Sequence, residues 1–147
     1  MGDRFRPHSS LPVPHALVGG TVSLPKKTVA AVLTRDGGLC VLRLDGCLGE
    51  ATVADHRANR GHGGAKSGVL DRLSNLLAAC GLCNGLKEDA EGDLRAVLEA
   101  RGVRLRSDST HAKTALRALV MPVEYPDGRR YYLDDLGGRE EVVEQPF

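Results

Sequence analysis

The residues of this chain that are best suited to chemistry lie between Cys40 and Lys87. The four cysteines form two pairs: six residues separate Cys40 from Cys47, and two separate Cys80 from Cys83. Thiolate sulfur suits the tetrahedral coordination of structural zinc, and a close pair of the Cys-x-x-Cys type is typical of such sites. The spacing therefore predicts one zinc site formed by all four cysteines.

Other states of the cysteines are possible from spacing alone. Two disulfides, in any of three connectivities, ordinary buried thiols and a redox pair are the alternatives. Disulfide frameworks belong to secreted chains, whereas the N-terminal sequence MGDRFRPHSS contains no apolar signal segment. No later stretch approaches the roughly 18 consecutive apolar residues of a membrane span. We therefore expect a soluble, cytoplasmic protein with reduced thiols and no membrane partner.

The loop between the two cysteine pairs has 32 residues. Closing a loop of that length costs roughly 3 kcal/mol of chain entropy, whereas structural zinc contributes about 10 to 16 kcal/mol on apparent scales. A bound zinc ion can therefore hold the loop closed and position what it contains. The loop includes the sequences ATVADHRANRGHGG and DRLSNLLAAC.

The order of polar residues around this loop resembles a known family. Asp55 and His56 stand together, Asn75 precedes the second cysteine pair, and Asn84 follows it directly in CGLCN. This order resembles that of the HNH endonucleases with a ββα-metal core, in an HNN variant because Asn84 takes the place of the last histidine. It is also similar to that of phage recombination endonucleases that cut branched DNA. The sequences ADHRANRGHGG and YPDGRRYYLDD resemble small HNH proteins of actinobacteria and their phages.

The resemblance implies a role for each residue of this set. His56 would be the general base that activates water, since histidine titrates close to working pH. Asp55 and Asn84 would offer hard oxygen ligands to one catalytic Mg²⁺ or Mn²⁺, distinct from the zinc. Asn75 would bridge backbone groups and orient the loop that aims His56. The implied fold is a small α+β ββα-metal (His-Me finger) core, and the implied products carry 5′-phosphate and 3′-hydroxyl ends.

The resemblance also implies partners. DNA would be the substrate, and a phage-encoded protein would work in the host cytoplasm, where phage packaging proteins such as a terminase are further candidate partners. Two alternatives stay open: a zinc-bound DNA-binding or packaging adaptor without cleavage activity, and a resolvase of branched DNA. Strict alternation along a strand would also place Asp55 and His56 on opposite faces, so the strand must end or bulge there.

Basic residues next to this set suggest contacts with DNA. Arg57 follows His56, and Lys87 lies three residues after Asn84, near the same helical face. We expect phosphate contacts from Arg57 and Lys87, with exposed solubilising charges as the alternative. The net charge is only +1, but residues 1–120 carry 17 Lys and Arg against 12 Asp and Glu, and residues 121–147 carry 3 against 7. The core can therefore present a positive face.

A chain of 147 residues fits one domain. We divide it into a loosely ordered N-terminal arm at 1–22, a zinc-bound nuclease core at 23–106 and a C-terminal extension at 107–147 with a β-hairpin and an acidic tail. Periodicity and turn residues predict the elements. The expected helices cover 25–35, begin near Cys83 with a helical stripe that continues through Leu94, Val97 and Leu98 to a stop at Gly102, and cover 110–120. Strands are expected in CVLRL and ATVADH, a hairpin from MPVEY and RRYYLDD, and a frayed end at EEVVEQPF.

Overall fold

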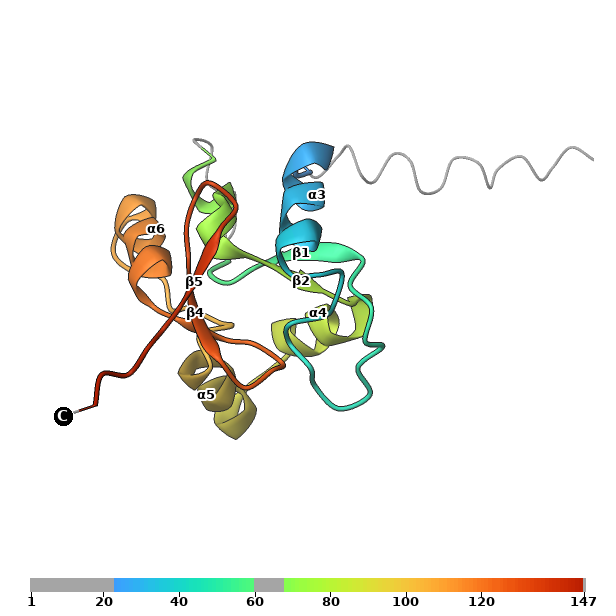
Figure 1. Ribbon diagram of the computed structural model, residues 1–147. Coiled ribbons are helices and arrows are strands. Elements are labelled where there is room, and N and C mark those ends of the chain that lie inside the picture. Colours follow the sequence, from blue (N-terminus) through green and yellow to red (C-terminus); the bar gives the residue numbers. More distant parts are fainter. Residues whose placement is uncertain (1–22, 60–67, 147) are drawn as a thin grey trace, which may run out of the picture.

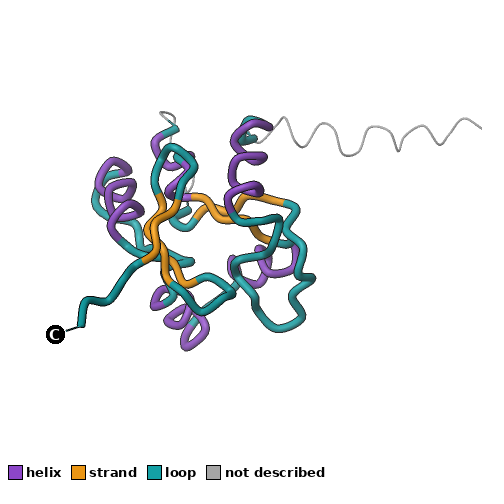
Figure 2. The backbone as a smooth tube through the Cα atoms, viewed as in Figure 1, coloured by secondary structure: helices purple, strands orange, loops and turns teal. Residues whose placement is uncertain are grey.

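Residues 23–59 and 68–146 are described in the computed structural model of the chain. They form a mixed α and β fold with two small antiparallel sheets, one of two strands and one of three (Figures 1 and 2). The expected arm at 1–22 lies outside the described residues. None of the described helices is long and apolar enough to cross a membrane.

The first described helix, α3, spans Lys26–Arg35, with Pro25 at its N-cap. It ends before Gly37 and Gly38, whose φ angles of 67° and 73° belong to the left-handed region that glycine adopts without strain. The helix predicted over 25–35 is therefore confirmed, and its boundaries follow from these proline and glycine residues.

Strands β1 (Val53–His56) and β2 (Leu76–Ala79) pair antiparallel, with His56 opposite Leu76. The expectation that the strand ends or bulges between Asp55 and His56 is wrong: both residues pair regularly within β1, opposite Leu77 and Leu76, so their side chains keep the alternation of a strand. Two short 3-10 helices, η2 (Val69–Asp71) and η3 (Leu73–Asn75), lead into β2. Among the described residues, β1 is therefore followed by two helical turns, a strand and then a helix.

Every residue of β2 is buried, because the strand is covered on both faces. Leu76 and Ala78 belong to a cluster that includes residues of α3, whereas Leu77 and Ala79 belong to the main core with Cys83 of the following helix. Figure 1 shows α3 and α4 on opposite sides of the β1–β2 pair. This strand pair therefore forms the central layer next to the cysteines.

The segment CVLRL, predicted as a strand, is not one. Only an isolated bridge joins Leu39 to Glu50, and Arg43 has a φ of 49°. The backbone N–H of Cys40 donates to the carbonyl of Gly49 at 2.9 Å, so the chain turns back within this segment. Val41 and Leu42 are buried and Leu44 is partly buried, and these residues pack around the cysteines instead of pairing in a sheet.

Three helices follow β2: α4 (Gly81–Glu88), α5 (Gly92–Ala100) and α6 (His111–Val120). The side chain of Thr110 caps α6 by accepting from the N–H of Lys113 at 3.1 Å, which satisfies a donor at the helix start. The helices predicted near Cys83 and over 110–120 are thus present, whereas the stripe expected to continue from Cys83 to Gly102 is divided into α4 and α5 at residues 89–91.

The C-terminal residues form the second sheet, with strands β3 (Val123–Glu124), β4 (Arg130–Leu133) and β5 (Arg139–Glu141). The predicted hairpin corresponds to β3 and β4, but the end predicted to be frayed contributes part of a third strand. This strand pairs with β4, and the guanidinium of Arg139 adds a cation–π contact, 4.6 Å and 4.2 Å from the ring centroids of Tyr125 and Tyr131.

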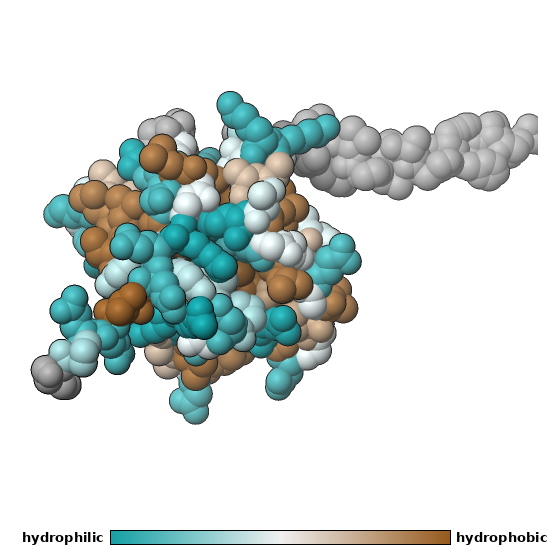
Figure 3. All heavy atoms as spheres, viewed as in Figure 1, coloured by the Kyte–Doolittle hydropathy of each residue, from teal (hydrophilic) through white to brown (hydrophobic). Residues whose placement is uncertain are grey.

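The C-terminal sheet shares the main core with the cysteine region. Val123 and Tyr125 are buried in the same cluster as Cys40. The hydroxyl of Tyr125 also donates to buried Asp36 at 2.5 Å, and Asp36 accepts from Ala78 of β2 at 2.9 Å. On the face drawn in Figure 3, hydrophobic side chains lie in patches separated by hydrophilic ones. Residues 107–142 therefore pack as part of the same body as the residues before them.

Candidate metal centre and active site

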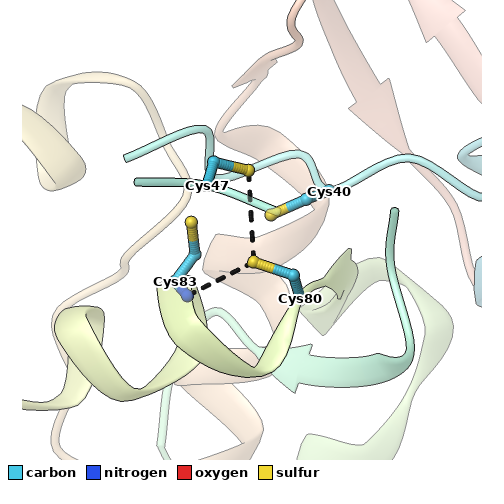
Figure 4. A group of neighbouring side chains, drawn as sticks. All are labelled: Cys40, Cys47, Cys80 and Cys83. Carbon is cyan, nitrogen blue, oxygen red and sulfur yellow. Dashed lines mark hydrogen bonds between the residues drawn. The ribbon is translucent and has the colours of Figure 1, made fainter. Parts of the chain in front are cut away.

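The four cysteines come together at the N-terminal end of α4. Their sulfur atoms all lie within 4.8 Å of one another, and Figure 4 shows the side chains of Cys40 and Cys47 converging on those of Cys80 and Cys83. Tetrahedral zinc with bonds of about 2.3 Å places its sulfur ligands about 3.8 Å apart, close to the 4.0 Å between Cys47 Sγ and Cys80 Sγ. The cluster can therefore hold a metal ion such as zinc, and all four cysteines are free thiols.

Backbone N–H groups donate to these sulfur atoms, as thiolate ligands require. Leu44 N–H donates to Cys83 Sγ at 3.4 Å, Gly49 N–H to Cys47 Sγ at 3.3 Å, and Cys83 N–H to Cys80 Sγ at 3.4 Å. Burial opposes ionisation of Cys80, but hydrogen bonds, first from the backbone of Cys83, lower its pKa to about 6. Hydrogen bonds thus favour the thiolate of Cys80, the form that binds metal, whereas burial raises the pKa of Cys40 and Cys83.

Asp55 and Lys87 form a buried ion pair next to the end of β1. Lys87 Nζ lies 2.6 Å from Asp55 Oδ2, and only 2 % and 4 % of the two side chains are exposed. The same ammonium group donates to the carbonyl of His56 at 2.5 Å. Burial raises the pKa of Asp55 and lowers that of Lys87, and each partner's charge opposes the shift. The expected phosphate contact of Lys87 is corrected: its ammonium group points inward, to Asp55.

His56 is the last residue of β1 and faces the helical turn η2. Its Nε2 lies 2.7 Å from Asp71 Oδ1, with 15 % of the His56 side chain and 25 % of the Asp71 side chain exposed. A carboxylate in this position fixes the orientation and tautomer of an imidazole ring. Asp71 was not among the site residues expected from the sequence. The only signal was an acidic residue in the loop, four positions before Asn75.

Asn75 ties together the segments that flank this loop. Its Oδ1 accepts from the N–H of Ala58 at 2.9 Å, and its Nδ2 donates to the carbonyls of Ala58 at 3.1 Å and Leu70 at 2.8 Å. The side chain is 1 % exposed, so it touches backbone groups and no solvent-facing surface. Asn75 therefore connects the residues just after His56 with the turn that carries Asp71.

Asn84 lies on α4, three residues before Lys87, and is half-buried. Residues three apart on a helix share a face. Because Lys87 reaches Asp55 and the backbone of His56, this face of α4 is turned toward the end of β1. The structure thus brings Asp55 and Lys87 into contact, with Asn84 one helical turn away on the same side.

Arg57 is fully buried, which corrects the expectation that it contacts phosphate. Only 1 % of the residue is exposed, and its guanidinium group donates to four backbone carbonyls at 2.7 to 2.8 Å, those of Gly102, Ser74, Ala118 and Met121. Two of these carbonyls belong to the C-terminal end of α6, where a cation also complements the helix dipole. Burial lowers the pKa of Arg57. Its observed role is to join β1 to three later segments.

Comparison with known proteins places the chain in a phage family. It is 36 % identical over 80 residues to the Gene 4 protein of Mycobacterium phage D29 and 38 % identical over 80 residues to the Gene 4 protein of Mycobacterium phage L5. Each alignment covers 54 % of this chain and 72 % of the relative. The chain therefore belongs to the family of these mycobacteriophage Gene 4 proteins, a name that states no activity. No family profile and no solved structure matches it.

Proposed function

We propose that this protein is a metal-dependent endonuclease of the HNH type that hydrolyses phosphodiester bonds of DNA. One observation supports this most directly: β1 ends at His56, and the antiparallel β2 leads into α4, which carries Asn84. This order matches what the resemblance to a ββα-metal core implied. A phage protein that cuts DNA would act in the host cytoplasm, with packaging proteins as candidate partners.

His56 is the proposed general base. When Nε2–H donates to Asp71, the basic lone pair of the ring is on Nδ1. That nitrogen would take a proton from water as the water oxygen attacks phosphorus and the bond from phosphorus to the 3′ oxygen breaks. Asp71 would hold the ring in place and stabilise the imidazolium that results, so it is a positioning residue.

The four cysteines would hold a structural zinc ion. Their thiolates and the backbone N–H groups that donate to them are the donor set that zinc uses in closed sites. The ion would keep the start of α4 fixed to the turn between Cys40 and Cys47. Because Asn84 directly follows Cys83, this centre would also set the position of Asn84 relative to β1.

Asp55 and Asn84 would hold the catalytic Mg²⁺ or Mn²⁺ through carboxylate and amide oxygens, which are the ligands these ions prefer. Such an ion supplies charge stabilisation at the phosphate and at the leaving 3′ oxygen. Asp55 and Asn84 are therefore of the residue types that can hold such an ion. Lys87, bonded to Asp55 Oδ2, neutralises part of the same carboxylate, so a bound ion would share Asp55 with an ammonium group or displace it.

The Asp55–Lys87 pair also supports a second candidate, a zinc-bound DNA-binding adaptor that does not cut. In an adaptor, this ion pair would be a structural element of the interior. The two functions differ in whether divalent ions produce cleavage, and not in whether DNA binds.

The experiment is incubation of purified protein with supercoiled plasmid and Mg²⁺ or Mn²⁺. Wild type should nick or linearise the plasmid, and His56→Ala should not. His111→Ala is the matched control, because His111 is exposed at the start of α6 and should leave cleavage unchanged. Zinc content is measured for each protein. A wild type that binds DNA but leaves it uncut with both ions would overturn the nuclease proposal in favour of the adaptor.

A further inference from the structure

A positively charged cavity lies beside the end of β1. Its volume is about 370 Å³, and five of its eight lining residues are basic while none is acidic. The lining residues are Arg57, Asn59, Lys87, Arg95, Arg104, Leu105, Arg106 and Ser107. They come from the segment after β1, from α4, from α5 and from the loop that follows α5, so the cavity exists only in the folded chain.

The cavity adjoins the candidate active site through Lys87. The side chain of Lys87 contacts Asp55 and the carbonyl of His56, while its own carbonyl accepts from Arg104 Nη1 at 3.0 Å. Arg104 is also near enough to contribute to the lowered pKa of Lys87. Lys87 therefore lies between the guanidinium of Arg104 and the backbone of His56.

Three arginines at the cavity carry more positive charge than their neighbours balance. Arg95 and Arg106 share a single carboxylate, that of Glu99, at 4.0 Å and 2.9 Å. The side chains of Arg95 and Arg106 are 47 % and 76 % exposed. Among the described residues, Arg104 has an ordinary hydrogen bond to a carbonyl and no carboxylate within ion-pair distance. These groups are thus able to accept a further anion.

We propose that this cavity binds a phosphate group of the DNA backbone, with Arg104 as the principal contact and Arg95 and Arg106 at its rim. Guanidinium groups match phosphate oxygens in shape and charge, and they can donate two hydrogen bonds in parallel. The inference rests on the proposed function for its choice of DNA, but it concerns binding and can be measured without cleavage. The three arginines are positioning residues that hold the strand near His56.

A contact with a DNA phosphate changes in a defined way how the affinity for DNA depends on salt concentration. Affinity for DNA falls as salt rises, and each phosphate that a protein neutralises on duplex DNA adds about 0.9 to the magnitude of the slope of log affinity against log salt concentration. Loss of one phosphate contact should therefore weaken binding for all sequences and lower this slope by about one. A variant that merely loosens the fold would change affinity without this defined change in slope.

The experiment measures fluorescence anisotropy of a short labelled DNA duplex between roughly 50 and 200 mM salt, with no Mg²⁺ or Mn²⁺ added. Arg104→Gln and Arg95→Gln should each lower the slope, and Arg104→Lys should retain most of it. Arg129→Gln is the control, since Arg129 is 64 % exposed and paired with Glu141 on the C-terminal sheet. Zinc content and thermal melting establish that every variant is folded.

The inference is overturned if both Gln variants keep the wild-type slope, or if wild type binds no duplex. It stands if the slope depends on Arg104 even when the protein cuts no plasmid, a result that would instead remove the nuclease proposal. Conversely, if wild type cleaves DNA and the Gln variants keep the wild-type slope, the cavity does not bind DNA phosphate. The proposed nuclease function would then stand without this contact.

Discussion

Lys87 and Asp55 meet in the interior at a distance of 2.6 Å, one residue from the histidine that ends β1. A buried ion pair contributes little net stability compared with an apolar pair, but removal of one partner leaves an uncompensated charge. Lys87→Met should therefore lower the free energy of unfolding by about 3 to 5 kcal/mol, whereas the double variant Asp55→Asn/Lys87→Met should lie much closer to wild type. Urea denaturation of the single and double variants gives the coupling, and additive losses would contradict a specific pair.

The same pair predicts how metal binding responds to Lys87. If Asp55 is a ligand of the catalytic ion, removal of the neighbouring ammonium group should strengthen the binding of Mn²⁺. We expect Mn²⁺ to raise the denaturation midpoint of Lys87→Met more than that of wild type, because a ligand that binds only the folded state stabilises it. Asp55→Asn/Lys87→Met is the control and should not respond. Equal stabilisation of both variants would place the Mn²⁺ site elsewhere.

The cysteine cluster predicts that the fold depends on a metal ion bound between the four thiols. Three of the four cysteines are themselves part of the buried core, so loss of the ion would leave that region without its main constraint. We expect about one zinc per chain by elemental analysis. Chelation, or the substitution Cys83→Ser, should cause cooperative loss of helical circular dichroism. A chelated protein with unchanged melting would show that the core holds without metal.

Asn75 makes three hydrogen bonds to backbone groups on both sides of the loop. Asn75→Ala should lower the free energy of unfolding by about 1 to 3 kcal/mol, because buried groups lose their partners. Cleavage should also fall, since the segment that follows His56 loses its attachment. Asn75→Asp keeps the acceptor for Ala58 N–H but loses both donated bonds, so it should not restore cleavage. Plasmid nicking rates and urea midpoints for the two variants test this.

Asp71 predicts a rate effect without a large change in stability. Asp71→Asn keeps the size of the side chain but removes the negative charge beside His56 Nε2. Hydrogen-bond partners that orient the ligands of a metal site typically contribute about 10- to 100-fold, and we expect plasmid nicking to slow by at least that factor. Asp135→Asn is the control variant, because it changes another nearby carboxylate, one that accepts from the N–H of Ser74. Unchanged nicking by Asp71→Asn would show that His56 does not depend on Asp71.

Local patterns in the sequence determined several parts of this protein. The two-residue spacing places Cys80 at the N-cap of α4 and Cys83 in its first turn. Local patterns predicted α3 and α6 close to their observed bounds, and the end of α5 before Gly102. These features depend on residues near one another in the chain, where helical spacing, proline and glycine act directly. That the two cysteine pairs come together was predicted from the ligand chemistry of four thiols.

The tertiary structure decided which charged residues are internal and which are available. Arg57 and Lys87 looked like phosphate contacts in the sequence, but carbonyls and a carboxylate from distant segments enclose them. The pairing of His56 with Asp71, and the cavity that gathers Arg104 with Arg95, likewise join separate parts of the chain. A long charged side chain can lie in water or in the interior, and its partners decide between them. Those partners come into place only when the whole chain folds.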